Sequence, residues 1–134
     1  MNYLFIAEQI LAMLDFIFHP KFEKEIAKLE RRFRNLKEGL KSFQRLCEVQ
    51  FHPANPKRII APAKLHRIKQ NDIWSLWKAE LIIPKSGLRP SQFPRIWFCV
   101  QGAKIGFLCI ATHVDNYKDN DMNNIALELL TDIF

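Results

Sequence analysis

Two apolar segments near the end of the chain most constrain how it can fold. Residues 95–100 read RIWFCV and residues 104–111 read KIGFLCIA, and both are rich in the aromatic and β-branched residues that are typical of strands. The three residues between them, QGA, are short enough for a tight antiparallel hairpin. The sequence therefore predicts two neighbouring strands of one antiparallel sheet.

Two amphipathic segments before these strands are predicted to be helices. Apolar residues recur along each at helical spacing, with Lys and Glu on the other side. The apolar positions are Phe22, Ile26, Leu29 and Phe33 in the first segment, and Leu36, Leu40, Phe43 and Leu46 or Cys47 in the second. Asn35 between them is a predicted cap. Together they indicate a helical hairpin whose apolar stripes meet each other or cover a common sheet.

The segments around this hairpin complete the pattern of elements. DFIFH (15–19) is predicted to be a short strand, and a helix then starts at Pro20 or Lys21; the alternative is one continuous helix that ends near Phe18. KLHRIKQ (64–70) and DIWSLWKAELII (72–83) are predicted to be strands as well. The last segment is an amphipathic helix, with Ile125, Leu129 and Ile133 on one face. The order indicates an α+β fold, in which a small antiparallel sheet carries a two-helix hairpin on one face.

The first fourteen residues, MNYLFIAEQILAML, are apolar but interrupted. Glu8 and Gln9 break the apolar run, no Lys or Arg precedes it and no small-residue cleavage site follows it. The segment is too short and too polar for a membrane span. Residues 1–14 are therefore predicted to be an N-terminal helical extension that packs on its own domain or on a partner, and 15–134 to be one domain.

Charge is distributed unevenly along the chain. The net charge is +6, but residues 57–104 hold ten Lys and Arg against two acidic residues, a local net charge of +8. Residues 105–134 hold one basic and five acidic residues. This asymmetry favours a cationic face for a polyanion, with nucleic acid as the leading candidate. The alternative is a solvated basic surface without a specific ligand.

The spacing of cysteines and histidines disfavours several kinds of site. Cys47, Cys99 and Cys109 are odd in number and form no CxxC pair, which favours a reducing, cytoplasmic setting over disulfides or zinc. The histidines show no HxH or HxxxH spacing, and no GxxxxGK, GxGxxG or GxSxG motif occurs. The sequence therefore predicts no metal and no cofactor, and a Ser or Cys nucleophile has no local support.

Basic, imidazole and phenol groups remain on or beside the predicted strands. Lys78 lies within a strand, Arg95 opens the first strand of the hairpin, and His113 follows the second. If the hairpin closes around Gly102, residues whose numbers sum to about 205 face each other, so Arg95 lies opposite about Ile110. His113 then lies just beyond, at the same end of the sheet.

Such a set suits cleavage of RNA without a metal. The ribose 2′-hydroxyl attacks the adjacent phosphorus, and arginine and lysine stabilise the charge that builds on the phosphoryl oxygens. An imidazole exchanges a proton at the leaving 5′ oxygen. Each residue also has a structural interpretation: Lys78 at a sheet edge, Arg95 holding a loop, His113 bonding a strand-end carbonyl, and Tyr117 covering the core. Composition and spacing leave both interpretations open.

Four stretches resemble the RelE/ParE superfamily of type II toxin–antitoxin toxins, above all its RelE-like ribonuclease branch. They are FIFHPKFEKEIAKLERRF, KLHRIK, IWSLWKAELII and PRIWFCVQGAKIGFLCIATHVDNY, and the resemblance covers roughly residues 15–134. It implies a sheet backed by two helices, cleavage of messenger RNA in the ribosomal A site, and neutralisation by a small antitoxin protein. No membrane is implied.

The resemblance also implies roles for single residues. Lys78 matches the basic residue of the family's central strand, and Arg95 matches its phosphate-contacting arginine. His113 falls where the family has an arginine or histidine, here as general acid, and Tyr117 where an aromatic residue often follows. The basic residues predicted to bind RNA around these four are Lys64, Arg67, Lys69 and Arg89. Two other functions stay open: a ParE-like, non-catalytic inhibitor of DNA gyrase, and a plain RNA-binding or degenerate toxin module.

Overall fold

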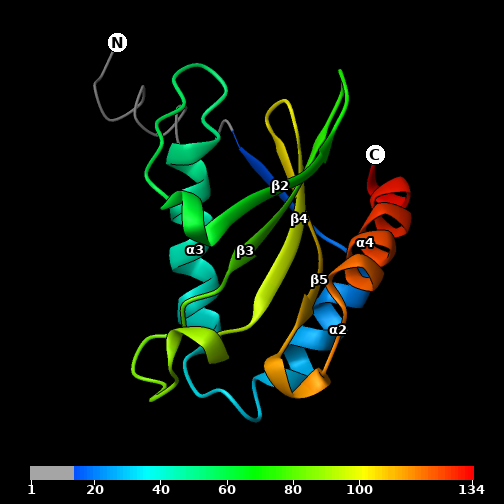
Figure 1. The fold of residues 1–134 in the computed structure, drawn as a ribbon. Helices are drawn as coiled ribbons and strands as arrows, with labels where there is room; N and C mark the ends of the chain where they lie inside the picture. Colours follow the sequence, from blue (N-terminus) through cyan, green and yellow to red (C-terminus); the bar gives the residue numbers. More distant parts are fainter. Residues whose placement is uncertain (1–13) are drawn as a thin grey trace.

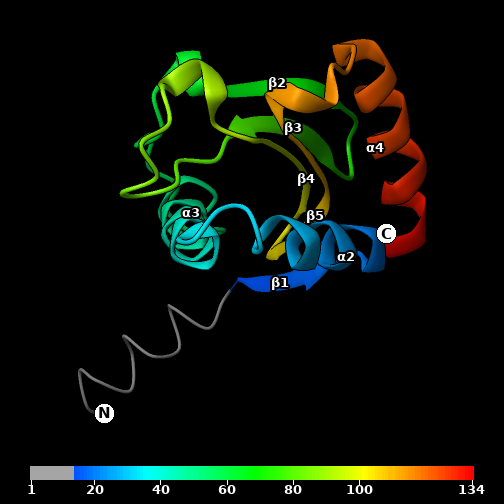
Figure 2. The ribbon, with the colours of Figure 1, turned by 90° about the horizontal axis from the view of Figure 1, so that it is seen from below.

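The computed structural model describes residues 14–134 as a curved five-stranded sheet with helices on both faces (Figure 1, Figure 2). The elements are β1 Asp15–Phe18, α2 Pro20–Leu29, α3 Leu36–Gln50, β2 Leu65–Gln70, β3 Ser75–Glu80, β4 Arg95–Gln101, β5 Lys104–Ala111 and α4 Asp119–Ile133. Short 3-10 turns are η1 Pro62–Lys64, η2 Pro90–Gln92 and η3 His113–Asp115. The α+β class is confirmed. The predicted extension, 1–14, lies outside the described residues apart from Leu14.

The sheet is mixed, where the sequence analysis predicted an antiparallel one. β2, β3, β4 and β5 pair antiparallel in chain order, but β1 pairs parallel with the outer edge of β5. Phe16 and Phe18 of β1 stack on Phe107 of β5, with ring centroids 5.9 Å and 5.3 Å apart. The prediction was wrong here because the partner of β1 lies near the other end of the chain, and no local turn sets the direction of β1.

Helices α2 and α3 form the predicted hairpin and cover one face of the sheet (Figure 2). Phe22 of α2 and Phe43 of α3 both contact Phe107, with ring centroids 5.5 Å and 6.0 Å apart. α3 also approaches the backbone after β3 so closely that a β carbon on Gly39 would lie 2.5 Å from the carbonyl oxygen of Ile82. Glycine, which has no β carbon, therefore allows α3 to pack this close to the backbone after β3.

The two helix starts are held in different ways. His19 caps α2: its Nδ1 accepts a hydrogen bond from the backbone N–H of Lys21 (3.0 Å), and its Nε2 donates to the carboxylate of Asp132 in α4 (2.8 Å). Asn35 precedes α3 as predicted, but its side chain makes no capping bond. Its Nδ2 donates instead to the carbonyl oxygen of Pro84, 2.8 Å away. Asn35 thus ties the helical hairpin to the loop after β3.

Helix α4 lies on the opposite face of the sheet from α2 and α3 (Figure 2). Its buried residues are Ala126 and Leu130, which pack in the same cluster as Leu108 of β5. Each comes one residue after Ile125 and Leu129 of the predicted stripe, which are only partly buried. Leu129 and Ile133 of the predicted stripe do pack against this cluster, while Ala126 was missed because a small residue does not stand out in a hydrophobic pattern.

The hairpin of β4 and β5 has the predicted register only near its turn. Phe98 lies opposite Phe107, as the sum of 205 requires. Leu108 then has no partner, so that a β-bulge shifts the remaining pairs by one. Arg95 therefore lies opposite Ala111, one residue later than predicted. This shift of one residue leaves Arg95 at the end of the sheet where it was predicted to lie.

Candidate active site

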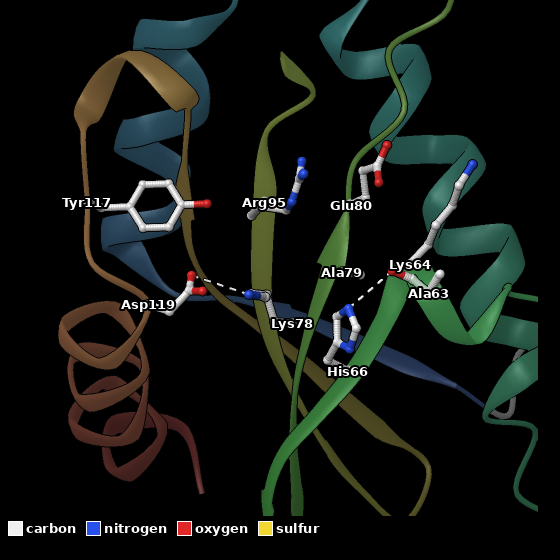
Figure 3. Close-up of a pocket in the computed structure, with 9 residues that line it drawn as sticks. All are labelled: Ala63, Lys64, His66, Lys78, Ala79, Glu80, Arg95, Tyr117 and Asp119. Atoms are coloured by element: carbon white, nitrogen blue, oxygen red, sulfur yellow. Dashed lines mark hydrogen bonds and ion pairs between the residues drawn. The ribbon is translucent and has the colours of Figure 1, made fainter. Parts of the chain in front are cut away.

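A polar cleft opens on the α4 face of the sheet, beside the start of α4 (Figure 3). Its volume is about 320 Å³. Its lining residues are Ala63, Lys64, His66, Lys78, Ala79, Glu80, Arg95, Tyr117 and Asp119. The cleft thus brings together Lys78, Arg95 and Tyr117, which were predicted to be catalytic, and Lys64, which was predicted to bind RNA.

Strand alternation puts the charged residues of β3 on this face. Leu76 is fully buried in the cluster under α4, and Lys78 and Glu80 follow at every second position, so that all three share one face. Lys78 lies beside His66 of β2, and Glu80 lies beside Arg95 of β4. Because α4 covers the Leu76 end of β3 and stops short of the other end, these four polar residues remain open to a ligand.

The cleft contains both cations and carboxylates. Lys78 Nζ lies 3.3 Å from Oδ1 of Asp119, the first residue of α4, and the two side chains are 16% and 61% exposed. The helix dipole favours a carboxylate at that position. Glu80 presents a second carboxylate, of which one buried oxygen has no hydrogen-bond partner among the described residues. The cleft therefore offers a paired ammonium and a second carboxylate.

Arg95 and Tyr117 approach the cleft from neighbouring elements. In Figure 3 the hydroxyl of Tyr117 points toward Arg95. The Tyr117 ring packs edge-on against Trp97, with centroids 5.7 Å apart, and Trp97 Nε1 donates to Asn123 Oδ1 (2.9 Å). Burial raises the pKa of the Tyr117 phenol, while the nearby guanidinium of Arg95 acts in the opposite direction. The phenol therefore keeps its proton at neutral pH and can donate a hydrogen bond.

The imidazole that lines the cleft is His66, which the sequence analysis did not single out. Its Nε2 lies 3.1 Å from the carbonyl oxygen of Ala63, and the residue is exposed. The signal that identifies His66 is the pairing of β2 with β3, which places it beside Lys78. A register shift between Arg67 and Lys69 breaks the alternation of β2, and for this reason the pattern of KLHRIKQ alone was not informative.

His113 begins η3 and is exposed. It follows Ala111, the partner of Arg95, by two residues, which agrees with its predicted place just beyond the strand end. It is not among the residues that line the cleft. The role of His113 as an acid stays a prediction.

The other predicted RNA-binding residues do not line this cleft. Arg67 lines a second cavity, together with Trp77 from the opposite side of β3. Lys69 is exposed and pairs with Leu76 in the ladder of β2 and β3. Arg89 precedes η2 and is also exposed. The predicted RNA-binding residues are therefore not gathered in the cleft.

The three cysteines are buried thiols without a disulfide. Burial raises the pKa of Cys99 and of Cys109 to about 12, and it also raises the pKa of Cys47. A thiol that stays protonated at neutral pH is a poor nucleophile, so none of the three suits covalent catalysis. Within residues 14–134, no group of three or more His, Cys, Asp or Glu residues is arranged to hold a metal ion.

Comparison of the chain with protein-family models, with curated proteins and with solved structures found no match. Over the range that the structure describes, no helix is both long enough and apolar enough to cross a membrane. The chemistry of the cleft and the sequence resemblance are therefore the observations that bear on function.

Proposed function

We propose that this protein is the toxin of a type II toxin–antitoxin system and acts as an endoribonuclease. It cleaves messenger RNA in the ribosomal A site without a metal ion, in the cytoplasm, and a small antitoxin protein neutralises it. The observation that carries the proposal is the cleft, in which Lys64, Lys78 and Arg95 lie with an imidazole and a phenol. The resemblance to RelE-like toxins supports the same activity.

Binding of the scissile phosphate is the task of the cations. Arg95 Nη1 donates to the carbonyl oxygen of Phe93, which leaves the other N–H donors of its planar guanidinium for phosphoryl oxygens, and Lys64 adds a point charge. The protonated phenol of Tyr117 donates a further hydrogen bond. These donors stabilise the negative charge that develops on the phosphoryl oxygens in the transition state, and in many enzymes such stabilisation contributes most to the rate.

Cleavage exchanges one bond to phosphorus for another. The ribose O2′ forms a bond to phosphorus and the bond from phosphorus to O5′ breaks, so the products carry a 2′,3′-cyclic phosphate and a 5′-hydroxyl. The carboxylate of Glu80, which lines the cleft, accepts the 2′-hydroxyl proton. Lys78 is held in an ion pair by Asp119, so it fits the role of a cation better than that of a base.

The proton for the leaving O5′ comes from an imidazole. We assign it to His66, because His66 lines the cleft, and His113 is the alternative, because it lies two residues beyond the partner of Arg95. General acid catalysis contributes roughly 10²- to 10⁴-fold to a rate. The two single substitutions, His66→Ala and His113→Ala, therefore separate the assignments: the larger loss identifies the acid.

The proposal is tested with purified protein, programmed ribosomes and mapping of the 5′ ends of the cleaved messenger RNA. Products with 5′-hydroxyl ends are expected. Arg95→Ala is expected to lower the rate by about 10²- to 10³-fold, and Arg95→Lys by less, because lysine keeps the charge but loses the fork. Thermal unfolding of each variant checks that it folds.

Full activity in a folded Arg95→Ala variant would contradict the assigned site. Binding of RNA with a steep salt dependence but without cleavage would instead identify a plain RNA-binding module. Inhibition of gyrase supercoiling with intact transcripts would identify a ParE-like inhibitor.

A further inference from the structure

A second cavity lies on the face of the sheet opposite the cleft and shares strand β2 with it. Its volume is about 370 Å³, and Gln50, Arg58, Ile60, Leu65, Arg67 and Trp77 are among the residues that line it. Residues of η1 and β2 alternate between the two sites: Lys64 and His66 line the cleft, whereas Leu65 and Arg67 line the cavity. β2 is an edge strand, so no further strand separates the two openings.

The cavity is cationic, and its charge is not neutralised within the described chain. Arg58 and Arg67 are exposed, and no carboxylate in residues 14–134 lies within ion-pair distance of either guanidinium. The cavity has no acidic lining residue, whereas the cleft has Glu80 and Asp119. The charged residues that line the cavity are therefore both cations that attract an anion.

Trp77 supplies the cavity with a fixed aromatic surface. Its Nε1 donates to Ser75 Oγ (2.8 Å), and Phe51 packs edge-on against it with ring centroids 5.2 Å apart. The guanidinium of Arg67 lies over the ring, 6.0 Å from the centroid. The carboxamide oxygen of Gln50 accepts hydrogen bonds from the backbone N–H groups of Ile59 and Ile60 (2.8 Å and 3.0 Å). The NH₂ group of Gln50 can therefore donate to a ligand.

We propose that this cavity binds a nucleotide that flanks the cleaved bond of the RNA, with the base on Trp77 and the phosphate on Arg58 and Arg67. A flat base needs an aromatic surface, a phosphate needs guanidinium forks, and the cavity combines both. The inference rests on the proposed function, because it places the RNA across β2 with its scissile bond in the cleft. It adds a subsite that binds the RNA at a position remote from the reacting atoms.

Direct binding is measured with adenosine 5′-monophosphate as the probe, by following the indole N–H signals of the ¹⁵N-labelled protein. The Trp77 signal is expected to shift and to saturate, while the signal of Trp97, buried under α4, stays in place. The double variant Arg58→Ala/Arg67→Ala is expected to bind the nucleotide about tenfold more weakly. Arg34→Ala/Arg45→Ala removes the same charge from exposed helical and turn positions outside the cavity, and it is expected to bind as the wild type does.

The same two double variants are then compared in ribosome-dependent cleavage, where only the cavity variant is expected to lose about tenfold in kcat/KM. An unmoved Trp77 signal, or equal binding by both double variants, would overturn the inference. An equal response of Trp77 to inorganic phosphate alone would overturn the stacking of a base. If the wild type cleaves no RNA but the nucleotide moves Trp77, the proposed function fails and the nucleotide site stands; cleavage without this binding rejects the site alone.

Discussion

The face of the sheet under α2 and α3 is apolar through its centre, with Ala79, Ile96, Phe98 and Phe107 at most 1% exposed. The α4 face begins in the same way, with Leu76 and Trp97 fully buried, but further along β3 and at the start of β4 it becomes polar. Lys78, Glu80 and Arg95 occupy positions that would be core on the other face.

This difference follows from how much of each face its helices cover. Two helices cover the first face, and a single helix set against β4 and β5 covers part of the second. Burial of the first face supplies the hydrophobic stabilisation, at about 25 cal/mol for each Å² of apolar surface removed from water. The second face can therefore carry charges that contribute to a site and not to the core.

Phe107→Ala is expected to have the largest effect on folding. Phe107 is fully buried and its ring contacts Phe16, Phe18, Phe22 and Phe43. Removal of such a ring costs about 3–5 kcal/mol in the free energy of unfolding, because the cavity only partly collapses. Urea denaturation followed by circular dichroism measures this loss.

Lys78→Ala on the other face is the matched comparison. Its ion pair with Asp119 is open to solvent through the exposed carboxylate, and such pairs contribute about 0–1 kcal/mol. The variant is therefore expected to unfold near the wild-type urea concentration while losing RNA cleavage. A loss of stability as large as that of Phe107→Ala would show that the cleft is part of the core and would break the contrast between the faces.

Gly39→Ala is expected to change the free energy of unfolding by less than Phe107→Ala does. Whether the protein loses or gains stability shows whether the contact with the sheet or helix propensity dominates. Alanine normally favours a helix over glycine by up to about 1 kcal/mol. Here its β carbon would lie 2.5 Å from the Ile82 carbonyl oxygen, so α3 must move from the sheet, which costs about 1–3 kcal/mol. Lys41→Ala, at an exposed position of α3, controls for helix propensity. A stabilised Gly39→Ala protein would show that α3 moves away from the backbone after β3 at little cost.

Features with a local cause could be predicted from the sequence. The hairpin of β4 and β5 depends on a short turn at Gly102, which takes a positive φ of 57°. Pro20 begins α2, and the apolar spacing of Phe22 and Ile26 gives its buried side. For the same reason Arg95 was correctly placed at one end of the sheet, within one residue of its partner.

Features that depend on distant parts of the chain could not be predicted. The direction of β1 is set by packing against Phe107, and the bulge at Leu108 is set by the sheet around it. His66 becomes a site residue only because β2 pairs with β3, and Asp119 only because α4 begins over Lys78. Of the residues that line the cleft, Lys64, Lys78, Arg95 and Tyr117 were named from the sequence, while one imidazole and both carboxylates were missed.

The smallest expected effect concerns a carboxyl group on the α2 side. Burial raises the pKa of Glu25, and the ammonium of Lys21 only partly opposes it; one of its carboxylate oxygens is buried without a hydrogen-bond partner among the described residues. The unfolded chain loses this proton near pH 4.5, before the folded protein does. Because the folded state then binds more protons than the unfolded state, the contribution of Glu25 to stability is complete below pH 4.5 and is lost as the pH rises through the raised pKa.

Glu25→Gln is therefore expected to be as stable as the wild type at about pH 4 and to become more stable than it toward about pH 7, in urea denaturation at a series of pH values. Glu128→Gln, on the exposed side of α4, is the control for the loss of one carboxylate. A difference between Glu25→Gln and wild type that does not change with pH would mean that Glu25 is as well solvated as the carboxylate of Asp119 in the cleft, and that the two helix layers do not differ in this respect.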